Sequence, residues 1–152
     1  MSKDRPWGKG TPTWTRDATT NDSSKDFVVP AGKMWNLKMI LAQITATATV
    51  GNRVLQMWVF NTVPEAVYKS ESSASITAST TGALRLYREA AAADTTVRPR
   101  IDGAADPTSE TNDILPDMLI PAGYSVRIAD SAAIDAAADD LIVVLHYVEY
   151  DA

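Results

Sequence analysis

Two stretches of the chain alternate apolar and polar side chains in the manner of a β-strand. In WNLKM (residues 35–39) the apolar positions are separated by Asn36 and Lys38, and in YSVRI (124–128) by Ser125 and Arg127. A strand with one buried face has this period of two, because successive side chains point to opposite faces. Both stretches are therefore predicted to be half-buried strands.

Each of these strands belongs to a strand–turn–strand unit, and the unit occurs twice. A Pro-Ala-Gly turn opens each unit, a polar turn follows the first strand, and a second strand returns. The return segments VLQMWVF and LIVVLHYVEY are almost continuously apolar, β-branched or aromatic, which is typical of central strands covered on both faces. In the first unit the opening turn is at 30–32, the polar turn at 45–52 and the return strand at 53–60. In the second unit they are at 121–123, 131–140 and 141–150.

The segments between the two units are less regular. Residues 62–81 are rich in Ser, Thr and Ala and predict an edge strand. The segment GALRLYRE (82–89) has a clearer strand pattern than residues 62–81. EAAAAD (89–94) has high helical propensity but is too short for a stable helix, so it predicts a helical turn or a loop. Residues 94–118 contain three prolines and many acidic residues and predict a long connection.

Many short strands, turn signals throughout and almost no helix predict an all-β protein with an antiparallel β-sandwich. The duplicated unit narrows this to a jelly-roll-like sandwich over residues 27–152, since a jelly roll contains two Greek keys. The predicted core residues are the apolar positions of the alternating strands: Val29, Trp35, Leu37, Met39, Leu41, Leu55, Met57, Leu84, Leu86, Val126, Ile128, Leu141, Val143 and Leu145.

Residues 1–26 predict an extended N-terminal arm, because they are polar and are interrupted by two prolines and two glycines. The arm nevertheless contains Trp7 and Trp14, and tryptophan is a preferred anchor of protein interfaces. These rings either dock on a neighbouring subunit or fold back on their own domain. Trp7 and Trp14, with Arg98 and Arg100 of the long connection, are the predicted interface residues.

Composition and charge exclude several classes of function. The chain has no cysteine and one histidine, so disulfides, thiolate metal sites and cysteine nucleophiles are excluded. Residues 1–26, 27–100 and 101–152 carry net charges of +1, +4 and −10, which gives no uniform basic face for nucleic acid. No apolar run approaches the roughly 20 residues that span a bilayer, and the N-terminus lacks the apolar segment of a signal peptide. Synthesis and folding in a cytosol are expected, with no membrane partner.

The candidate chemical groups do not form a recognisable catalytic set, so no enzymatic activity, cofactor or metal is expected. His146 lies in an apolar strand and is interpreted as a core residue. Asp139 and Asp140 are adjacent and point to opposite sides of a strand, so they are expected to end the preceding loop instead of forming an acid–base pair. The acidic residues of 102–117 suggest calcium, but their spacing does not match a calcium-binding loop, and a solvated or subunit-contacting loop is preferred.

Aromatic side chains raise a second possibility, because aromatic faces stack on sugar rings. Trp35 and Trp58 are the relevant residues, and both lie in strands with strong burial patterns. Core packing is therefore the preferred interpretation for both tryptophans.

The segments VPAGKMWNLKMI, TATVGNR and IPAGYSVRIADSAAIDAAADDLIVVLHYVEY resemble small β-sandwich proteins encoded among the virion structural genes of tailed bacteriophages. In those proteins a Pro-Ala-Gly turn before a strand, a Val-Gly-Asn-Arg turn and a late Asp-Asp pair recur together. The resemblance covers about 65 of the 152 residues in two blocks, and residues 1–26 and 62–118 lie outside it.

The resemblance implies a virion component, made in the host cytoplasm, and in particular a capsid cement or decoration protein on the outside of the phage head. Such a protein forms homotrimers that hold neighbouring major capsid proteins together. Because related sandwiches occur in tails, the alternative is a tail or fibre component with a receptor- or carbohydrate-binding β-sandwich.

Overall fold

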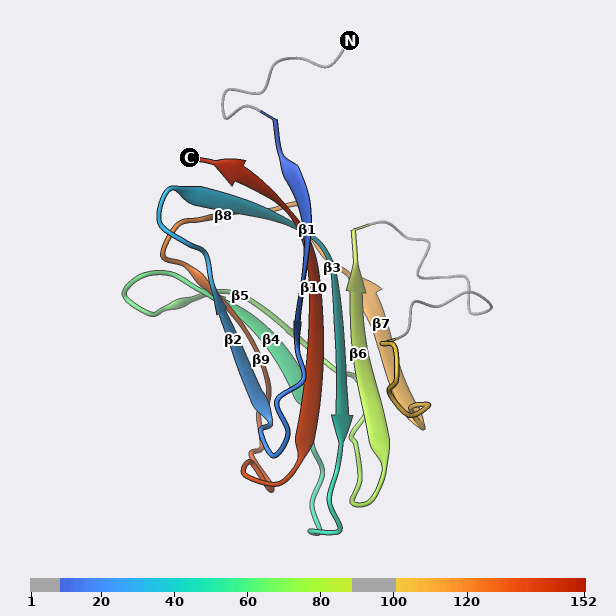
Figure 1. Cartoon of the computed structure of the whole chain (residues 1–152). Coiled ribbons are helices and arrows are strands. Elements are labelled where there is room, and N and C mark those ends of the chain that lie inside the picture. Colours follow the sequence, from blue (N-terminus) through green and yellow to red (C-terminus); the bar gives the residue numbers. More distant parts are fainter. Residues whose placement is uncertain (1–8, 89–100) are drawn as a thin grey trace.

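The protein is an all-β sandwich of two facing sheets, as the sequence predicts (Figure 1). The computed structural model describes residues 9–88 and 101–152, and within these ranges it contains ten strands and no helix. Three of the predicted interface residues, Trp7, Arg98 and Arg100, lie outside the described residues, as does the predicted turn at 89–94.

The first sheet, sheet A, has the strand order β1-β10-β3-β6-β7, and β8 pairs with the start of β3. All its neighbouring strands are antiparallel except β6 and β7, which are parallel. Its strands are β1 (Thr11–Asp17), β3 (Lys33–Thr45), β6 (Thr81–Tyr87), β7 (Ser109–Ile114), β8 (Leu119–Pro121) and β10 (Asp140–Asp151). The second sheet, sheet B, is antiparallel with the order β2-β9-β4-β5. Its strands are β2 (Ser24–Val28), β4 (Leu55–Phe60), β5 (Ala66–Glu71) and β9 (Ser125–Asp130).

This strand order is that of a jelly roll. Eight strands form two four-stranded layers, β1-β10-β3-β6 facing β2-β9-β4-β5, and the chain crosses from one layer to the other in the sequence that two interlocked Greek keys require. The other two strands, β7 and β8, are additions to the connection between β6 and β9. The predicted jelly-roll-like sandwich is confirmed.

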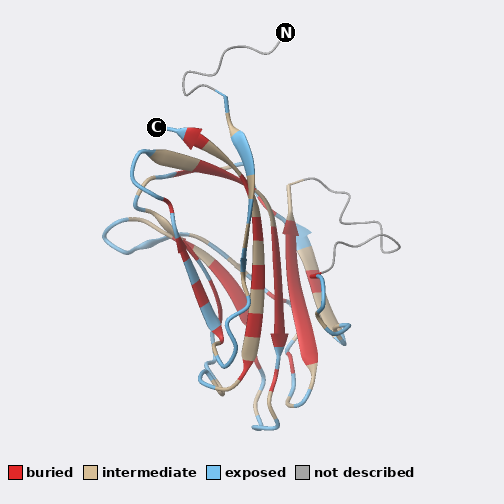
Figure 2. Cartoon of the chain, in the orientation of Figure 1, coloured by how far each residue is buried: buried red, intermediate tan, exposed pale blue. Residues whose placement is uncertain are grey.

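The two strand–turn–strand units are not hairpins, because each unit places one strand in each sheet. The units pair with one another: β3 with β10 in sheet A, and β4 with β9 in sheet B. Both return strands, β4 and β10, are interior strands as predicted. The side chains of β10 alternate between buried and half-buried, so only its inward face is fully covered (Figure 2).

The core lies between the sheets and contains the predicted residues with two corrections. Met39 is half-buried, and Leu41, although covered, lies outside the core cluster. The cause is an irregularity in the pairing of β3 with β10: His146 pairs with Met39, but Tyr147 pairs with Leu37. The additional residue shifts the alternation by one position, so Ile40, instead of Met39, faces the core.

The predicted arm, residues 1–26, is too long, because it contains β1 and the first part of β2. β1 pairs with β10 along its whole length, and β2 pairs with β9. Lys25, which is 1 % exposed, fixes the connection between β1 and β2: its Nζ donates to the carbonyl oxygen of Thr19 at 2.8 Å and forms ion pairs with Asp17 and Asp22. Pro12 is tolerated in β1 because β1 is an edge strand.

The predictions for the middle of the chain are partly correct. β5 is an edge strand, as expected, and the strand predicted at 82–89 is present as β6, which lies between β3 and β7. The long connection at 94–118, however, contains β7 and the start of the segment that leads to β8. The sequence of β7, SETNDI, has no apolar alternation. The pairing of β7 with β6 therefore could not be predicted from a hydrophobic pattern in the sequence.

Candidate interaction surfaces

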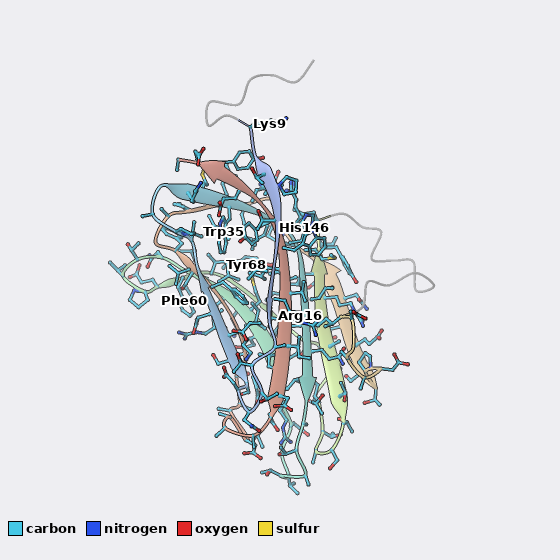
Figure 3. The ribbon with its side chains drawn as sticks, in the orientation of Figure 1. Lys9, Arg16, Trp35, Phe60, Tyr68 and His146 are labelled. Carbon is cyan, nitrogen blue, oxygen red and sulfur yellow. The ribbon has the colours of Figure 1, made fainter. Side chains whose placement is uncertain are left out.

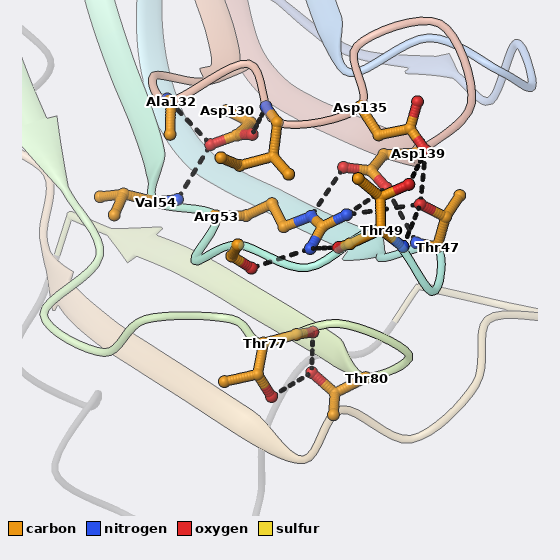
Figure 4. Close-up of polar contacts among 12 residues, drawn as sticks. Thr47, Thr49, Arg53, Val54, Thr77, Thr80, Asp130, Ala132, Asp135 and Asp139 are labelled. Carbon is orange, nitrogen blue, oxygen red and sulfur yellow. Dashed lines mark hydrogen bonds and ion pairs between the residues drawn. The ribbon is translucent and has the colours of Figure 1, made fainter.

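Two residues from the motifs that resemble phage proteins, Arg53 and Asp139, form a buried latch at one end of the sandwich (Figure 4). Arg53 and Asp139 are both fully buried, and the guanidinium donates from Nε and Nη2 to the two carboxylate oxygens at 2.9 and 3.1 Å. Nη1 of Arg53 donates to the carbonyl oxygens of Thr49 and Gly51 at 2.8 and 2.9 Å. The latch joins the β3–β4 turn to the β9–β10 loop.

Further hydrogen bonds extend this latch to both connections. Asp135 accepts from the hydroxyls of Thr47 and Thr49 at 2.6 and 2.9 Å. Asp130 accepts from three backbone amides, those of Val54, Ala132 and Ile134. The Val-Gly-Asn-Arg and Asp-Asp motifs therefore hold two inter-sheet connections together.

The protonation states in the latch follow from its geometry. Burial by itself raises the pKa of Asp139, but the hydrogen bonds from Arg53 and the Thr47 amide outweigh burial and hold that pKa below its ordinary value. The hydrogen bonds to Asp139 raise the pKa of Arg53. Both groups are charged at neutral pH, and the pair is a structural ion pair. Asp139 and Asp140 lie at the junction of the β9–β10 loop with β10, and Asp140 accepts from the amide of Asn21 instead of joining the pair.

The acidic C-terminal third does not form one acidic surface. Asp130 and Asp139 are buried in the latch. At the other end of β10, Asp151 and Glu149 form ion pairs with Lys33 at 2.7 and 3.7 Å. These four acidic residues therefore lie at opposite ends of the sandwich and not on one surface.

The predicted anchor Trp14 projects from β1 on the outer face of sheet A. Its indole ring stacks on the imidazole of His146 with ring centroids 4.0 Å apart and planes inclined by 5°, yet Trp14 remains 57 % exposed. Figure 3 shows His146 and Arg16 along the same side of the molecule. The Nη2 atom of Arg16 donates to the carbonyl oxygen of Asp102 at 3.1 Å. Trp14 is thus a rigidly supported aromatic ring with an accessible surface.

His146 is half-buried and faces outward, so its interpretation as a core residue is wrong. Sequence reasoning missed the stacked pair because the partners are far apart in the chain, and only the pairing of β1 with β10 places Trp14 opposite His146.

We expect stability to depend on His146 in mildly acidic solution. Burial, and secondarily the charge of Lys38, lowers the pKa of this imidazole below its ordinary value of 6.5. The unfolded chain therefore binds the proton first, and stability falls as the pH drops from about 6.5 through the folded pKa. Unfolding of wild type and His146→Gln, measured by urea titration between pH 7.5 and 5, checks this. The variant should lose less stability over that range, and parallel curves would contradict the expectation.

The outer face of sheet B carries a second aromatic cluster. One row of paired residues crosses all four strands: Asp26, Arg127, Trp58 and Lys69. Trp58 is half-buried on this face, so the prediction that it packs in the core is wrong. In β4 the residues Leu55, Met57 and Val59 face inward, and because the outward positions are also largely apolar, the sequence did not separate the two faces.

Next to this row, Phe60 and Arg127 form a shallow hollow. The Arg127 guanidinium lies 5.0 Å from the centre of the Phe60 ring, and Trp58 stacks on Phe60 at 6.3 Å. The Nε atom of Arg127 also donates to Asp26 at 2.7 Å. The hollow, about 220 Å³ in volume, is lined by Phe60, Pro64, Ser125 and Arg127.

Within residues 9–88 and 101–152, no group of three or more His, Asp or Glu side chains is placed to hold a metal ion. The same part of the chain contains no helix that could cross a membrane.

Trp35, the other tryptophan considered for sugar binding, is 4 % exposed and packs in the core as predicted.

The fold and these surfaces define a jelly-roll protein with two aromatic outer faces. No protein-family model matches the sequence, and no curated protein is detectably similar to it. Similar solved structures include the Gx strain of infectious bursal disease virus, with 11 % identity and a TM-score of 0.30 over 92 % of this chain and 32 % of the viral chain. T=1 particles derived from the same virus give 11 % identity and a TM-score of 0.31 over 91 % of this chain and 38 % of that one. The chain spans about a third of the length of these viral chains, and similarity at this level assigns neither family nor function.

Proposed function

We propose that this protein is a structural virion component, a capsid cement or decoration protein that binds the outside of a phage head and stabilises contacts between major capsid proteins. It acts by binding, without chemistry of its own, and functions as a homotrimer. The motif resemblance supports the phage assignment. The observation that carries a binding role is Trp14, an aromatic ring that is 57 % exposed and is held in place by its stack on His146.

Rigid support of an exposed tryptophan favours binding for a physical reason. Tryptophan is among the residues that contribute most to protein interfaces. A ring whose orientation is already fixed loses little conformational entropy on binding. Trp14 lies on the edge strand β1, and Trp7 precedes it by seven residues in the sequence, so both rings are assigned to the same proposed contact. Residues 1–16, with Trp7, Trp14 and Arg16, are the proposed capsid contact.

Cement of this kind stabilises the shell by mass action. A protein that binds the assembled shell and not its dissociated subunits lowers the free energy of the assembled state. Three linked copies bind together more tightly than each copy alone, because the second and third contacts are intramolecular. Modest contacts around Trp14 are therefore sufficient.

The test uses shells of the virus that encodes the protein, prepared without this protein. A deletion of residues 1–26 would remove β1 and more than half of β2, so the appropriate variants are a deletion of residues 2–8 and Trp14→Ala. Each variant should lower the affinity for shells by roughly tenfold or more, as expected for loss of an anchor residue. Val50→Ala, at a valine that is 90 % exposed in the β3–β4 turn, is the control and should bind as wild type.

Wild-type occupancy by Trp14→Ala, with circular dichroism unchanged, would rule out this face as the capsid contact. Absence of wild-type binding to the shells would rule out the cement role.

The second candidate function is a tail or fibre component that binds carbohydrate. It is favoured by the presence of two aromatic side chains, Trp58 and Phe60, together on the outer face of sheet B. Against it, one face of the Phe60 ring already lies against the Arg127 guanidinium. Retention of the isolated protein on a glycan array, lost in Trp58→Ala, would favour this function over the cement role.

A further inference from the structure

We propose that a hollow on the outer face of sheet A receives a lysine or arginine side chain of the major capsid protein. This Asp140 hollow, about 170 Å³ in volume, is lined by residues 18–20, 103–105 and 140–142, with Gln43 and Thr45. The inference rests on the proposed function for the identity of the partner, and it specifies the chemistry of the side chain that the partner presents.

Two connecting segments border the hollow, and hydrogen bonds hold both of them in place. The segment before β7 is held on sheet A by Gln43, whose Nε2 donates to the carbonyl oxygen of Ala105 at 2.5 Å. The connection between β1 and β2 is held by Lys25, whose Nζ donates to the carbonyl oxygen of Thr19 at 2.8 Å. The hollow is therefore present before any partner binds, which lowers the entropic cost of binding.

The side chains at the bottom of the hollow offer hydrogen-bond acceptors. Asp140 accepts from the backbone amide of Asn21, and no lysine or arginine of residues 9–88 and 101–152 forms an ion pair with its carboxylate. Gln43 is 5 % exposed, and because its Nε2 is bound to Ala105, its Oε1 is left to accept. Thr45 adds a hydroxyl group. A ligand that donates hydrogen bonds and carries positive charge fits this set.

The composition of the hollow favours an organic cation over a metal ion. Ca²⁺ takes about six to eight oxygen ligands, usually with several carboxylates, whereas the hollow contributes only the carboxylate of Asp140. Ile142 and Ala105 add aliphatic surface beside it. Lysine and arginine cover aliphatic surface with their stems and place the charged group at a carboxylate. A volume near the ~150 Å³ of a cavity that binds benzene is suited to one such side chain.

The charges around the hollow also favour a cation. The ammonium of Lys25 is occupied by two ion pairs, with Asp17 at 3.3 Å and Asp22 at 3.2 Å. Arg16 donates to the carbonyl oxygen of Asp102, whose carboxylate offsets the charge of the guanidinium. Carboxylates therefore outnumber cations around the hollow among the described residues, and a basic side chain is attracted to it.

The position of the hollow makes it continuous with the proposed capsid contact. β1 pairs with β10 so that Trp14 lies opposite His146 and Arg16 opposite Val144, and His146 and Arg16 follow one another along this face (Figure 3). The next outward residue of β10 is Ile142, in the hollow. One partner surface can therefore cover the Trp14 ring and fill the hollow. A second copy is disfavoured as the partner, because the chain carries a net charge of −5 and copies repel one another.

The test measures binding of full-length Asp140→Asn to shells that lack this protein. Asparagine keeps an oxygen that accepts from the Asn21 amide and removes only the charge. The variant should bind shells at least tenfold more weakly than wild type, as expected when a buried charge pair loses one partner, and its affinity should depend less on salt. Asp151→Asn removes the same charge from a side chain that is 87 % exposed at the other end of β10 and should bind as wild type. Circular dichroism verifies that both variants are folded.

A second measurement requires no shells. Titration of the free protein with Nα-acetyl-lysine methylamide, followed by nuclear magnetic resonance, should shift the backbone amide signals of Thr45, Gly103 and Leu141 in wild type and not in Asp140→Asn.

Wild-type affinity of Asp140→Asn for shells would overturn the inference and leave the cement role standing. A lower sedimenting mass of Asp140→Asn than of wild type would assign the hollow to a second copy and overturn the capsid as its partner. If wild type binds no shells, amide shifts confined to wild type would support the cation site and remove the cement role, and absence of these shifts would overturn both.

Discussion

Replacing Asp139 by alanine is expected to lower the free energy of unfolding by about 3–5 kcal/mol, because it leaves the fully buried Arg53 guanidinium without its carboxylate. The melting temperature should fall by roughly 10 °C for a chain of this size. Chemical denaturation of purified protein, monitored by far-UV circular dichroism, measures the loss. Loss of the latch also frees the β3–β4 turn from the β9–β10 loop.

Two further variants separate the buried pair from charge in general. Asp151→Ala removes a carboxylate that is 87 % exposed at the other end of β10 and should leave stability near wild type. The double variant Arg53→Met/Asp139→Leu removes both charges and should recover part of the loss, since the energetic cost arises from an unpaired buried charge. A double variant as unstable as Asp139→Ala would contradict this explanation.

The second large effect is expected at Trp35, where alanine should cost about 3–5 kcal/mol of unfolding free energy. Trp35 is 4 % exposed, stacks on Tyr147 at 4.1 Å, and donates from Nε1 to Glu149 at 2.9 Å. Both contacts join β3 to β10, the two longest strands of sheet A. Urea unfolding of the variant, compared with wild type, gives the loss.

A graded series distinguishes packing from hydrogen bonding at this site. Trp35→Phe retains an aromatic ring against Tyr147 and loses the indole donor, so it should cost less than half as much as Trp35→Ala. Trp14→Ala makes the same truncation at a ring that is 57 % exposed, and should cost about 1 kcal/mol from the lost stack on His146. Equal losses for Trp14→Ala and Trp35→Ala would show that burial does not determine the effect.

Alternation of apolar side chains was sufficient to predict the sandwich and most of its core, because strands with one buried face keep a period of two. It failed at Met39, where an irregular pairing shifts the alternation, and at Trp58, where both faces of a strand are apolar. It also failed for β1 and β7. These edge strands are fixed by backbone pairing with β10 and β6, and that pairing requires no apolar pattern.

The candidate surfaces were harder to predict from the sequence than the fold was. Trp14 was identified as an anchor from its residue type, but its support by His146 arises from two strands at opposite ends of the chain. Arg53 and Asp139 belong to recognised motifs, yet only their burial shows that the motifs stabilise the fold.

Electron cryo-microscopy of the purified virus, at a resolution that separates subunits, tests the virion assignment most directly. The account predicts jelly-roll density in groups of three on the outer surface of the head, with the β1 face and Trp14 against the major capsid protein. Particles without this density on the head, or with the chain located in the tail, would contradict it.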